Sequence, residues 1–479
     1  MSALSATNGT PTKIGIVGYY GVGNLGDETV VAILINRIRA HYPHAEVVGI
    51  SLNPEDTQRR HGIKALPMIW RREGGRASAP HVHAEISFRR RLYGRLKKLL
   101  MPWPFVFRPL KAAKDFCCRL PHDLPFLRRT FSRLKGFEML VVPGSGPLTD
   151  WWGGAFTHPY FFWSWAFLAR LRGVKVIVLS IGSERLTTRL GKRFCKSFLS
   201  MAQYRSFRDR SSRDAMKVLG VKDDDPVFPD QGFALDEVLG SAAPEECNHQ
   251  YEDARSGLII AVSPLGQASY VPDDGDDSVH KRYIERLSAV CVWLLTMGYR
   301  IAFCPTDCVQ DTPFVEEIIA YIKTALPGVD LSGQILNDPI LTTADLVKRI
   351  QMCDMMIASR FHGIVLSFAL QKPVLALSYG KKMSDLMIAC GQGAYHRDLD
   401  KAEVAEVIQM FKALEHNRRS IAQHLGAVVS DYKCMLDKQY RHVFGTVPAQ
   451  QREGRGPDGD WMPLRELRLH EAMAGAGSR

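Results

Sequence analysis

The segment at residues 14–52 constrains the fold more than any other, because it has the pattern of a strand, a glycine-rich turn, a helix and a second strand. An apolar run at 14–19 leads into the turn at 21–26, and a helix follows that ends near His41, before an apolar run at 45–52. Consecutive strands joined through a helix run parallel to each other. The segment therefore predicts a parallel sheet with helices on both of its faces.

The same alternation of apolar runs and amphipathic segments continues along the chain and falls into two halves. Further strands are expected at 137–146, 174–182 and 204–212 in the first half, and at 257–266, 299–307, 355–360 and 373–379 in the second. The polar, aperiodic residues 241–256 are typical of a linker. We therefore predict an α/β fold of two doubly wound domains, at 13–245 and 256–445, facing a cleft. The tail at 446–479 is predicted to be disordered.

The positive charge of the chain is concentrated in one segment. The 479 residues carry a net charge of +12, and 59–135 alone holds 20 Lys and Arg against 4 Asp and Glu. We interpret 59–135 as a basic insertion in the first domain. Within it, 88–114 begins with six Lys and Arg at 89–98, interleaved with leucines and followed by Trp103, Phe105 and Phe107. This pattern is typical of a helix that lies on an anionic membrane surface.

A solvated or core-packed insertion is an equally open interpretation of the basic segment. Nucleic acid is not expected as a partner, because the aromatic residues of 88–114 form no recognisable stacking platform.

Several classes of protein are excluded by what the sequence lacks. No apolar run reaches the ~18–20 residues that a membrane helix needs, and the N-terminal segment has no apolar stretch typical of a secretory signal. The ten cysteines show no zinc-site spacing, and no carboxylate cluster suggests a metal. We expect a cytoplasmic protein without a metal ion, and leave open a peripheral position on the inner face of the cytoplasmic membrane.

The turn at 21–26 has the G-x-G-x-x-G spacing of a dinucleotide-binding loop, but its surroundings do not favour that function. Such a loop needs an acidic residue at the end of the second strand to bind the ribose, and that strand ends here in Ile50-Ser51-Leu52. Asp27 and Glu28 also stand where a pyrophosphate would approach, and would repel it. We therefore interpret the glycines as a tight turn with exposed backbone at the cleft edge.

A stronger signal lies in the second half, where a strand delivers Arg360 and His362 to the start of a helix. The helix N-terminus offers unpaired N–H groups and partial positive charge. Arg360 adds a fork suited to phosphate or carboxylate, and His362 can donate a proton near neutral pH. Tyr379 and the pair Lys381-Lys382 are expected at the same edge. The pattern predicts a site for a small, highly anionic ligand, the alternative being that Arg360 and His362 cap a helix or pair with surface acids.

Four motifs, in order along the chain, resemble those of the polysaccharide pyruvyl transferases. They are Gly-Asn-Leu-Gly-Asp-Glu (23–28), Gly-Ser-Gly-Pro-Leu-Thr-Asp (144–150), Ser-Phe-Arg-Asp-Arg-Ser-Ser (206–212) and Ser-Arg-Phe-His-Gly (359–363). The resemblance covers roughly residues 13–58 and 137–395. The chain departs from the family pattern at Pro143, and at Ser183-Glu184, where Gly-Pro would be expected.

The resemblance implies a GT-B-like arrangement of two Rossmann-type domains, with the acceptor bound by the first domain and the donor by the second. It also implies transfer of pyruvate from phosphoenolpyruvate (PEP) onto a sugar as a ketal, in the biosynthesis of a surface polysaccharide or exopolysaccharide. PEP would be a co-substrate, and no cofactor is expected. The acceptor would be a sugar or a lipid-linked oligosaccharide.

The resemblance also suggests roles for individual residues. His362 is expected to be the general acid that protonates the methylene carbon of PEP. Asp150 and Asp27 are candidates for the base that takes a proton from the attacking hydroxyl, and both could equally be structural caps. The set expected to bind PEP is Arg208, Ser359, Arg360, His362, Gly363, Tyr379 and Lys381. The expected acceptor-side loops contain Gly21, Gly23, Asn24, Gly26, Gly144 and Gly146.

Two other functions stay open at this point. A GT-B glycosyltransferase that uses a nucleotide sugar would share the architecture, but it would place a ribose-binding Glu near the Arg360 loop, and Asp385 is the only acid between 355 and 390. A non-catalytic protein that associates with a membrane surface through 88–114 is the second alternative.

Overall fold

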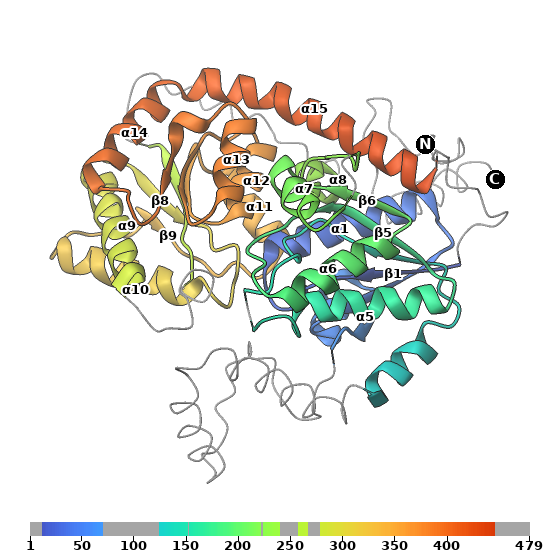
Figure 1. Cartoon of the computed structure of the whole chain (residues 1–479). Coiled ribbons are helices and arrows are strands. Elements are labelled where there is room, and N and C mark those ends of the chain that lie inside the picture. Colours follow the sequence, from blue (N-terminus) through green and yellow to red (C-terminus); the bar gives the residue numbers. More distant parts are fainter. Residues whose placement is uncertain are drawn as a thin grey trace, which may run out of the picture.

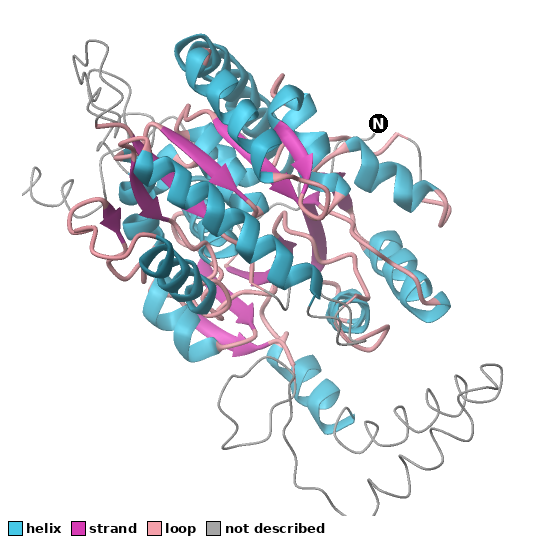
Figure 2. Cartoon of the chain, turned by 90° about the vertical axis from the view of Figure 1, so that its left-hand side faces the viewer, coloured by secondary structure: helices cyan, strands magenta, loops and turns pink. Residues whose placement is uncertain are grey.

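The computed structural model describes residues 12–69, 124–151, 153–221, 224–239, 257–266 and 278–445. These residues form two domains, each built on a six-stranded parallel sheet (Figure 1). Figure 2 shows strands of these sheets between layers of helices. The expected linker at 241–256, the basic segment 88–114 and the tail 446–479 lie outside the described residues.

The first sheet has the strand order β3-β2-β1-β4-β5-β6. Its strands are β1 (Lys13–Val17), β2 (Glu46–Ser51), β3 (Lys64–Pro67), β4 (Met139–Val142), β5 (Lys175–Ile181) and β6 (Tyr204–Phe207). The helices of this domain are α1 (Leu25–His41), α2 (Pro54–His61), α5 (His158–Leu171), α6 (Arg189–Met201) and α7 (Arg210–Lys217), followed by η1 (Gln231–Ala234) and α8 (Asp236–Leu239).

The second sheet has the order β12-β11-β10-β7-β8-β9. Its strands are β7 (Ile259–Ser263), β8 (Arg300–Phe303), β9 (Ile335–Leu336), β10 (Met355–Ala358), β11 (Val374–Ser378) and β12 (His396–Asp398). The helices are α9 (Ser278–Thr296), α10 (Thr312–Ala325), α11 (Thr343–Gln351), α12 (Phe361–Ala369), α13 (Lys381–Ala389), α14 (Val404–His416) and α15 (Arg418–Phe444).

Both sheets have the same topology, in which the third, second, first, fourth, fifth and sixth strands of the domain lie side by side. This is the order of a Rossmann dinucleotide-binding fold, so the prediction of two Rossmann-type domains is confirmed. One detail differs. The first sheet continues through β3, inside the range 59–135 that the charge pattern assigns to an insertion, because a short strand with one exposed lysine resembles the basic stretch that follows it.

Alternating side chains of the first sheet enter two separate cores. On β4, Met139 and Val141 join the core beneath α1, which is continuous with the core of the second domain. Leu140 and Val142 face the opposite side and pack beneath α5 and α6. This division follows from the two-residue period of a strand. It leaves α5 and α6 on the side of the sheet away from α1 and α15 (Figure 1).

The last helix ties the two domains together. It begins in the second domain and runs across the first, where Gln439 is fully buried (Figure 1). The amide of Gln439 donates to the Ser206 hydroxyl at 2.5 Å and accepts from the Ser180 hydroxyl at 3.3 Å. Ser180 has a φ of 46°, which is rare outside glycine. Among the described residues, no helix is both long and apolar enough to cross a bilayer.

Replacing Gln439 by Ala should destabilise the protein, because the buried hydroxyls of Ser180 and Ser206 would each lose a hydrogen bond. An unsatisfied buried polar group costs about 1–3 kcal/mol, so urea-induced unfolding should move to lower urea concentration. The exposed Gln423 on the same helix is the matched control, and its replacement by Ala should leave the midpoint unchanged. Equal midpoints for the two variants would contradict a role of Gln439 in joining the domains.

Candidate active site

The carboxyl ends of the two sheets meet at the junction between the domains. The N–H of Leu25, at the start of α1, donates to the carbonyl of Thr306 at 2.7 Å, and the N–H of Cys308 donates to the carbonyl of Gly23 at 2.9 Å. The glycine turn after β1 is therefore docked onto the loop after β8. Backbone at a sheet edge of this kind is where α/β folds bind their ligands.

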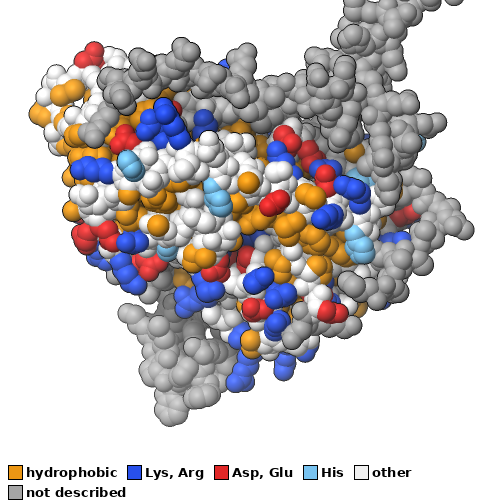
Figure 3. All heavy atoms as spheres, turned by 90° about the horizontal axis from the view of Figure 1, so that it is seen from above, with side chains coloured by type: hydrophobic (Ala, Val, Ile, Leu, Met, Phe, Trp, Pro, Cys, Tyr) orange, Lys and Arg blue, Asp and Glu red, His pale blue; other side chains and the backbone are white. Residues whose placement is uncertain are grey.

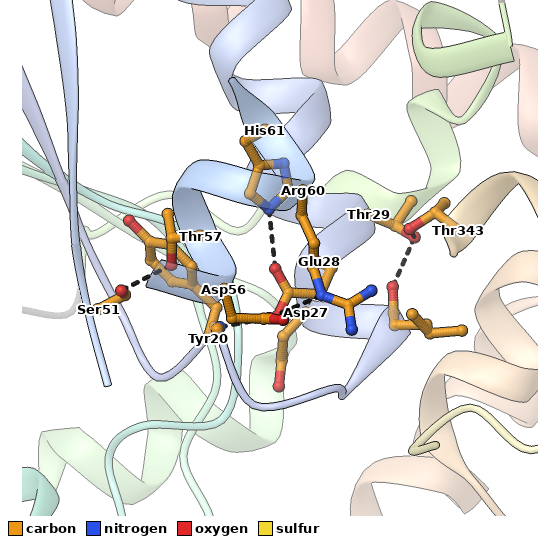
Figure 4. A network of polar contacts seen from close by, with 12 residues as sticks. Tyr20, Asp27, Glu28, Thr29, Ser51, Asp56, Thr57, Arg60, His61 and Thr343 are labelled. Atoms are coloured by element: carbon orange, nitrogen blue, oxygen red, sulfur yellow. Dashed lines mark hydrogen bonds and ion pairs between the residues drawn. The ribbon is translucent and has the colours of Figure 1, made fainter. Parts of the chain in front are cut away.

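The glycine turn is closed by an acid of its own helix. The N–H of Gly21, which has a φ of 81°, donates to Oε1 of Glu28 at 2.7 Å. The other carboxylate oxygen of Glu28 lies 2.8 Å from Nε2 of His61 (Figure 4). Glu28 is buried, so a carboxylate already occupies the backbone donor that a pyrophosphate would need. This geometry agrees with the interpretation of the turn as a structural feature.

The third glycine of the turn makes room for His362 from the other domain. A Cβ atom added at Gly26 would lie 2.2 Å from Cγ of His362, well inside contact distance. Nε2 of His362 is buried, and no hydrogen-bond partner for it is found among the described residues. The imidazole is thus held in place by packing, with one nitrogen still able to bind a ligand.

Two cations from different domains converge on the ring of Phe361. The guanidinium carbon of Arg208 lies 4.1 Å from the ring centroid, and Nζ of Lys382 lies 5.7 Å from it. Arg208 is buried and contacts Asp230 through a long hydrogen bond of 3.4 Å. Its Nη2 is buried with no hydrogen-bond partner among the described residues. Like charges brought together this way favour binding of an anion.

Lys382, and not Lys381, is the lysine of this site. Nζ of Lys382 pairs across the domain junction with Glu184 at 2.5 Å and lies 5.0 Å from the ring centroid of Tyr379. Lys381 points outward with 75% of its side chain exposed and pairs with Asp385 at 3.1 Å. Lys381, which the sequence predicts as a PEP ligand, therefore lies outside this cluster of cations. The two neighbours diverge because they lie about 100° apart around the first turn of α13.

Arg360 is engaged by an acid of its own domain. Its Nε lies 3.0 and 3.1 Å from the two carboxylate oxygens of Asp311, and its Nη2 also donates to Asp311. Asp311 is fully buried and accepts from the N–H of Asp307 at 3.0 Å. Arg360 therefore fixes the loop that docks onto the glycine turn. This edge of the guanidinium pairs with an acid, as one alternative expected, but that acid is buried and not on the surface.

Asp150 has the contacts of a structural residue. Its carboxylate accepts hydrogen bonds from the N–H groups of Thr187 and Thr188, at 2.8 and 2.7 Å, and from both of their hydroxyls. This leaves little capacity to accept a proton from a sugar, so the structural alternative fits Asp150. Gly144 and Gly146 lie on the same side of the junction, close to Ser180 and Glu184 respectively.

Ser359 and Gly363 form the floor beneath His362. The N–H of Ser359 donates to the carbonyl of Ser263 at 2.9 Å, which joins the ends of β10 and β7. A Cβ added at Gly363 would lie 3.0 Å from the Ser263 hydroxyl, so α12 packs closely on the end of β7 at this point. These residues position His362. Asn24 is likewise an N-cap, accepting from the N–H of Asp27 at 3.4 Å.

Comparison with known protein families finds one family that matches most of the chain. A family model described as polysaccharide pyruvyl transferase matches residues 24–381. The chain belongs to the polysaccharide pyruvyl transferase family. The four motifs on which the resemblance was based all lie within or at the edge of this match. Among curated proteins, none matches the sequence.

Solved structures confirm the GT-B-like fold of this family member. HepE of Anabaena in complex with UDP has a TM-score of 0.51 at 11% identity, covering 91% of this chain and 100% of that chain. A glycosyltransferase from Rickettsia africae has a TM-score of 0.50 at 12% identity, covering 90% and 98%. The UDP-GlcNAc 2-epimerase of Neisseria meningitidis, bound to UDP-GlcNAc, has a TM-score of 0.50 at 11% identity, covering 90% and 100%. Similarity at this identity shows the fold alone.

Three residues of this candidate site are absent from the set that the sequence predicts as ligands. They are Glu184, Asp230 and Lys382. Glu184 is the departure from the family pattern, and its partner lies 198 positions away, so no local pattern reveals the pair. Asp230 follows β6 in a polar segment that ends the domain. Among the described residues, no group of His, Cys, Asp and Glu side chains is arranged to hold a metal ion.

Burial shifts the two proton-bearing groups of the site in opposite directions. The pKa of Asp27 is raised to about 7, chiefly by burial, then by repulsion from Glu28 and Asp230, against the attraction of Lys382 and Arg208. The pKa of His362 is lowered to about 4, chiefly by burial and then by the nearby cations, against the attraction of Asp230. Without a ligand, His362 is therefore neutral at pH 7, and Asp27 is partly protonated.

Replacing Asp27 by Asn should stabilise the protein above pH 7 and should give little gain near pH 4. The folded state binds the Asp27 proton more tightly than the unfolded state, so wild-type stability falls as the pH rises from about 4 through 7. Thermal unfolding at several pH values measures this, at roughly 2–4 °C for each kcal/mol in domains of this size. Any packing effect of Asn is independent of pH, so a constant difference between the two proteins would contradict the raised pKa.

Proposed function

We propose that this protein transfers pyruvate from PEP onto a sugar as a ketal, in the assembly of a surface polysaccharide or exopolysaccharide. The observation that carries the proposal is the convergence of Arg208 and Lys382, one from each domain, on the ring of Phe361 beside His362. Membership of the family supports pyruvate as the group that is transferred. The cluster of cations supports an anionic donor.

PEP fits the groups that this cluster offers. It carries about three negative charges near neutral pH, on a phosphate and a carboxylate. Nη2 of Arg208 and Nε2 of His362 are buried nitrogen atoms without a hydrogen-bond partner among the described residues, and such groups are costly unless a ligand engages them. An arginine grips a carboxylate or phosphate through paired N–H bonds. We assign the PEP anion to Arg208, Lys382 and His362, with Tyr379 beside them.

Glu184 would exchange places with the donor. In the ligand-free arrangement its carboxylate neutralises Lys382 and lies against Gly146, where a Cβ would be 2.6 Å from Oε1. An incoming phosphate carries more charge than one carboxylate and would displace Glu184 from the lysine. The released carboxylate would then face the glycine loop of the first domain, which is the acceptor side of the proposed reaction.

The proposed reaction balances with protein groups and two sugar hydroxyls alone. One hydroxyl oxygen bonds to C2 of PEP while C3 gains a proton and becomes a methyl group. The second hydroxyl then displaces phosphate from C2, its own proton leaves with the phosphate, and the ring of the ketal closes. The first step needs a general acid, and we assign it to His362, whose pKa would rise when a trianion binds beside it. We assign the base that receives the hydroxyl proton to Asp27 in its ionised form.

A nucleotide-sugar donor is the competing interpretation, since similar folds contain UDP or UDP-GlcNAc. It is weakened by Glu28, which fills the glycine turn, and by the absence of an acid other than Asp385 between 355 and 390. Thermal shift separates the two, because a ligand that binds only the folded protein raises the melting temperature by an amount that grows with the logarithm of its concentration relative to its Kd. We expect stabilisation by PEP and none by UDP.

Replacing Lys382 by Gln should weaken PEP binding, while replacing Lys381 by Gln should not. Loss of a charge-assisted contact costs about 1.5–3 kcal/mol, or roughly 10- to 150-fold in the dissociation constant. The two variants lose the same charge at adjacent positions, so nonspecific electrostatics are controlled. Arg360→Ala is a poorer test, because it would leave buried Asp311 unpaired. Equal PEP affinity in both lysine variants would remove Lys382 from the donor site.

Replacing His362 by Gln should lower turnover strongly while the dissociation constant of PEP changes only a few-fold. Glutamine retains hydrogen-bonding capacity but cannot act as a general acid, so the rate should fall alone. The measurement is phosphate release with PEP and a panel of aryl glycosides, with the pyruvylated product identified by mass. A variant that turns over at a near-normal rate would exclude His362 as the acid. Binding that falls in step with the rate would make it an anchor for phosphate.

A further inference from the structure

One face of the first domain carries many cations and almost no acids. Residues 151–201 contain eight Lys and Arg and a single acid, Glu184, which is paired with Lys382. The two helices of this face, α5 and α6, contain no Asp or Glu. Figure 3 shows the α15 side of the molecule, where basic and acidic side chains are intermixed. The α5–α6 face, residues 156–171 and 189–201, has charge of one sign.

Large apolar side chains lie along the same face. Tyr160, Trp163, Phe167 and Leu171 follow one another at helical spacing on α5. Phe167 is 41% exposed and Leu171 is 60% exposed. Trp163 stacks on Phe167 with ring centroids 5.3 Å apart, and Phe194 of α6 lies 5.1 Å from Trp163. The result is a continuous, partly exposed aromatic strip between the two helices, of the kind that marks an interaction site.

Exposed arginines flank the aromatic strip on both sides. Arg170 follows Phe167 by three positions on α5, and Arg189 and Arg193 lie on the outward side of α6. None of the three forms an ion pair with an acid in the described part of the chain, and their own helices offer none. Long cationic side chains beside aromatic rings suit a boundary between an apolar phase and anionic headgroups.

We infer that the α5–α6 face binds the surface of an anionic lipid bilayer. The aromatic strip would enter the headgroup region, and the arginines would contact lipid phosphates. A second copy of this chain is disfavoured as the occupant, because a two-fold interface would set the same positive face against itself. The basic segment 88–114 has the same sign of charge and would not neutralise the face. Nucleic acid is disfavoured because the rings pack against one another.

The position of the face gives this contact a consequence for function. Helix α6 begins beside Thr188, whose hydroxyl bonds to Asp150 in the loop at the domain junction. Parallel strands bring the N-termini of α5 and α6 to the same edge of the sheet as the site. A bilayer on this face would therefore lie next to the junction, where a lipid-linked acceptor would enter. The inference rests on the helices alone and holds whether or not PEP is the donor.

The test is co-sedimentation of the full chain with vesicles of phosphatidylcholine that contain about one third phosphatidylglycerol. Wild type should pellet at low salt, should be released at high salt, and should stay in solution with pure phosphatidylcholine. The triple variant Arg170→Gln, Arg189→Gln and Arg193→Gln should bind at least about tenfold more weakly. The double variant Phe167→Gln and Leu171→Gln should also bind more weakly. The binding that it retains should be more sensitive to salt than that of wild type.

Two comparisons decide the outcome. The matched control changes three exposed cations of the second domain, Lys281, Arg282 and Lys323, to Gln and should bind as wild type does. A variant with the six Lys and Arg of 89–98 changed to Gln should retain binding through the α5–α6 face. Wild-type binding by the Arg170, Arg189 and Arg193 variant, with circular dichroism confirming its fold, would overturn the inference. So would a change in its sedimentation coefficient without vesicles, which would assign the face to a second copy.

Discussion

The hydrogen bonds between the turn after β1 and the loop after β8 hold the domains in the arrangement on which the site depends. A helix N-terminus leaves its first amides without partners, which makes it an anion site in many Rossmann domains. In this chain those amides are used differently. The Leu25 N–H bonds to Thr306 of the other domain, and the Asp27 N–H bonds to the Asn24 side chain. The fingerprint spacing serves domain docking, and Gly26 allows His362 to approach the backbone of α1.

Charge balance is the second constraint, because this junction is buried. Three acids near the site each pair with a cation: Asp311 with Arg360, Asp230 with Arg208, and Glu184 with Lys382. A buried charge left alone is expensive, and breaking one partner of a buried pair destabilises strongly. The pairs are not equivalent. Arg360 and Asp311 make several close contacts, whereas Arg208 reaches Asp230 at 3.4 Å and keeps an unpartnered nitrogen. The long Arg208–Asp230 contact therefore leaves Arg208 able to bind an anionic ligand.

The sequence predicts the architecture well, because most strands of a Rossmann fold are short apolar runs between helices. Each such strand can be predicted from its own residues. The strands β9 and β12 are not predicted, because two or three residues are too few to show a pattern. The site was predicted less completely, since its contacts join distant positions. Neither the pairing of Arg360 with Asp311 nor that of Lys382 with Glu184 leaves a local signal. The direction of adjacent lysines depends on where α13 begins, and a shift of one residue exchanges Lys381 for Lys382.

The order of the pKa values at the junction bears on how a proton donor would be made there. A histidine is ordinarily a stronger base than an aspartate, but here the pKa of Asp27 is about 7 and that of His362 about 4. Both shifts have burial as their largest cause, which disfavours carboxylate and imidazolium alike. As the pH falls, the ligand-free site therefore protonates Asp27 first and His362 only at lower pH. An anion placed between Arg208 and Lys382 would raise both pKa values, so His362 would gain its proton only with that anion bound, whereas Asp27 would accept a hydroxyl proton only in its ionised form.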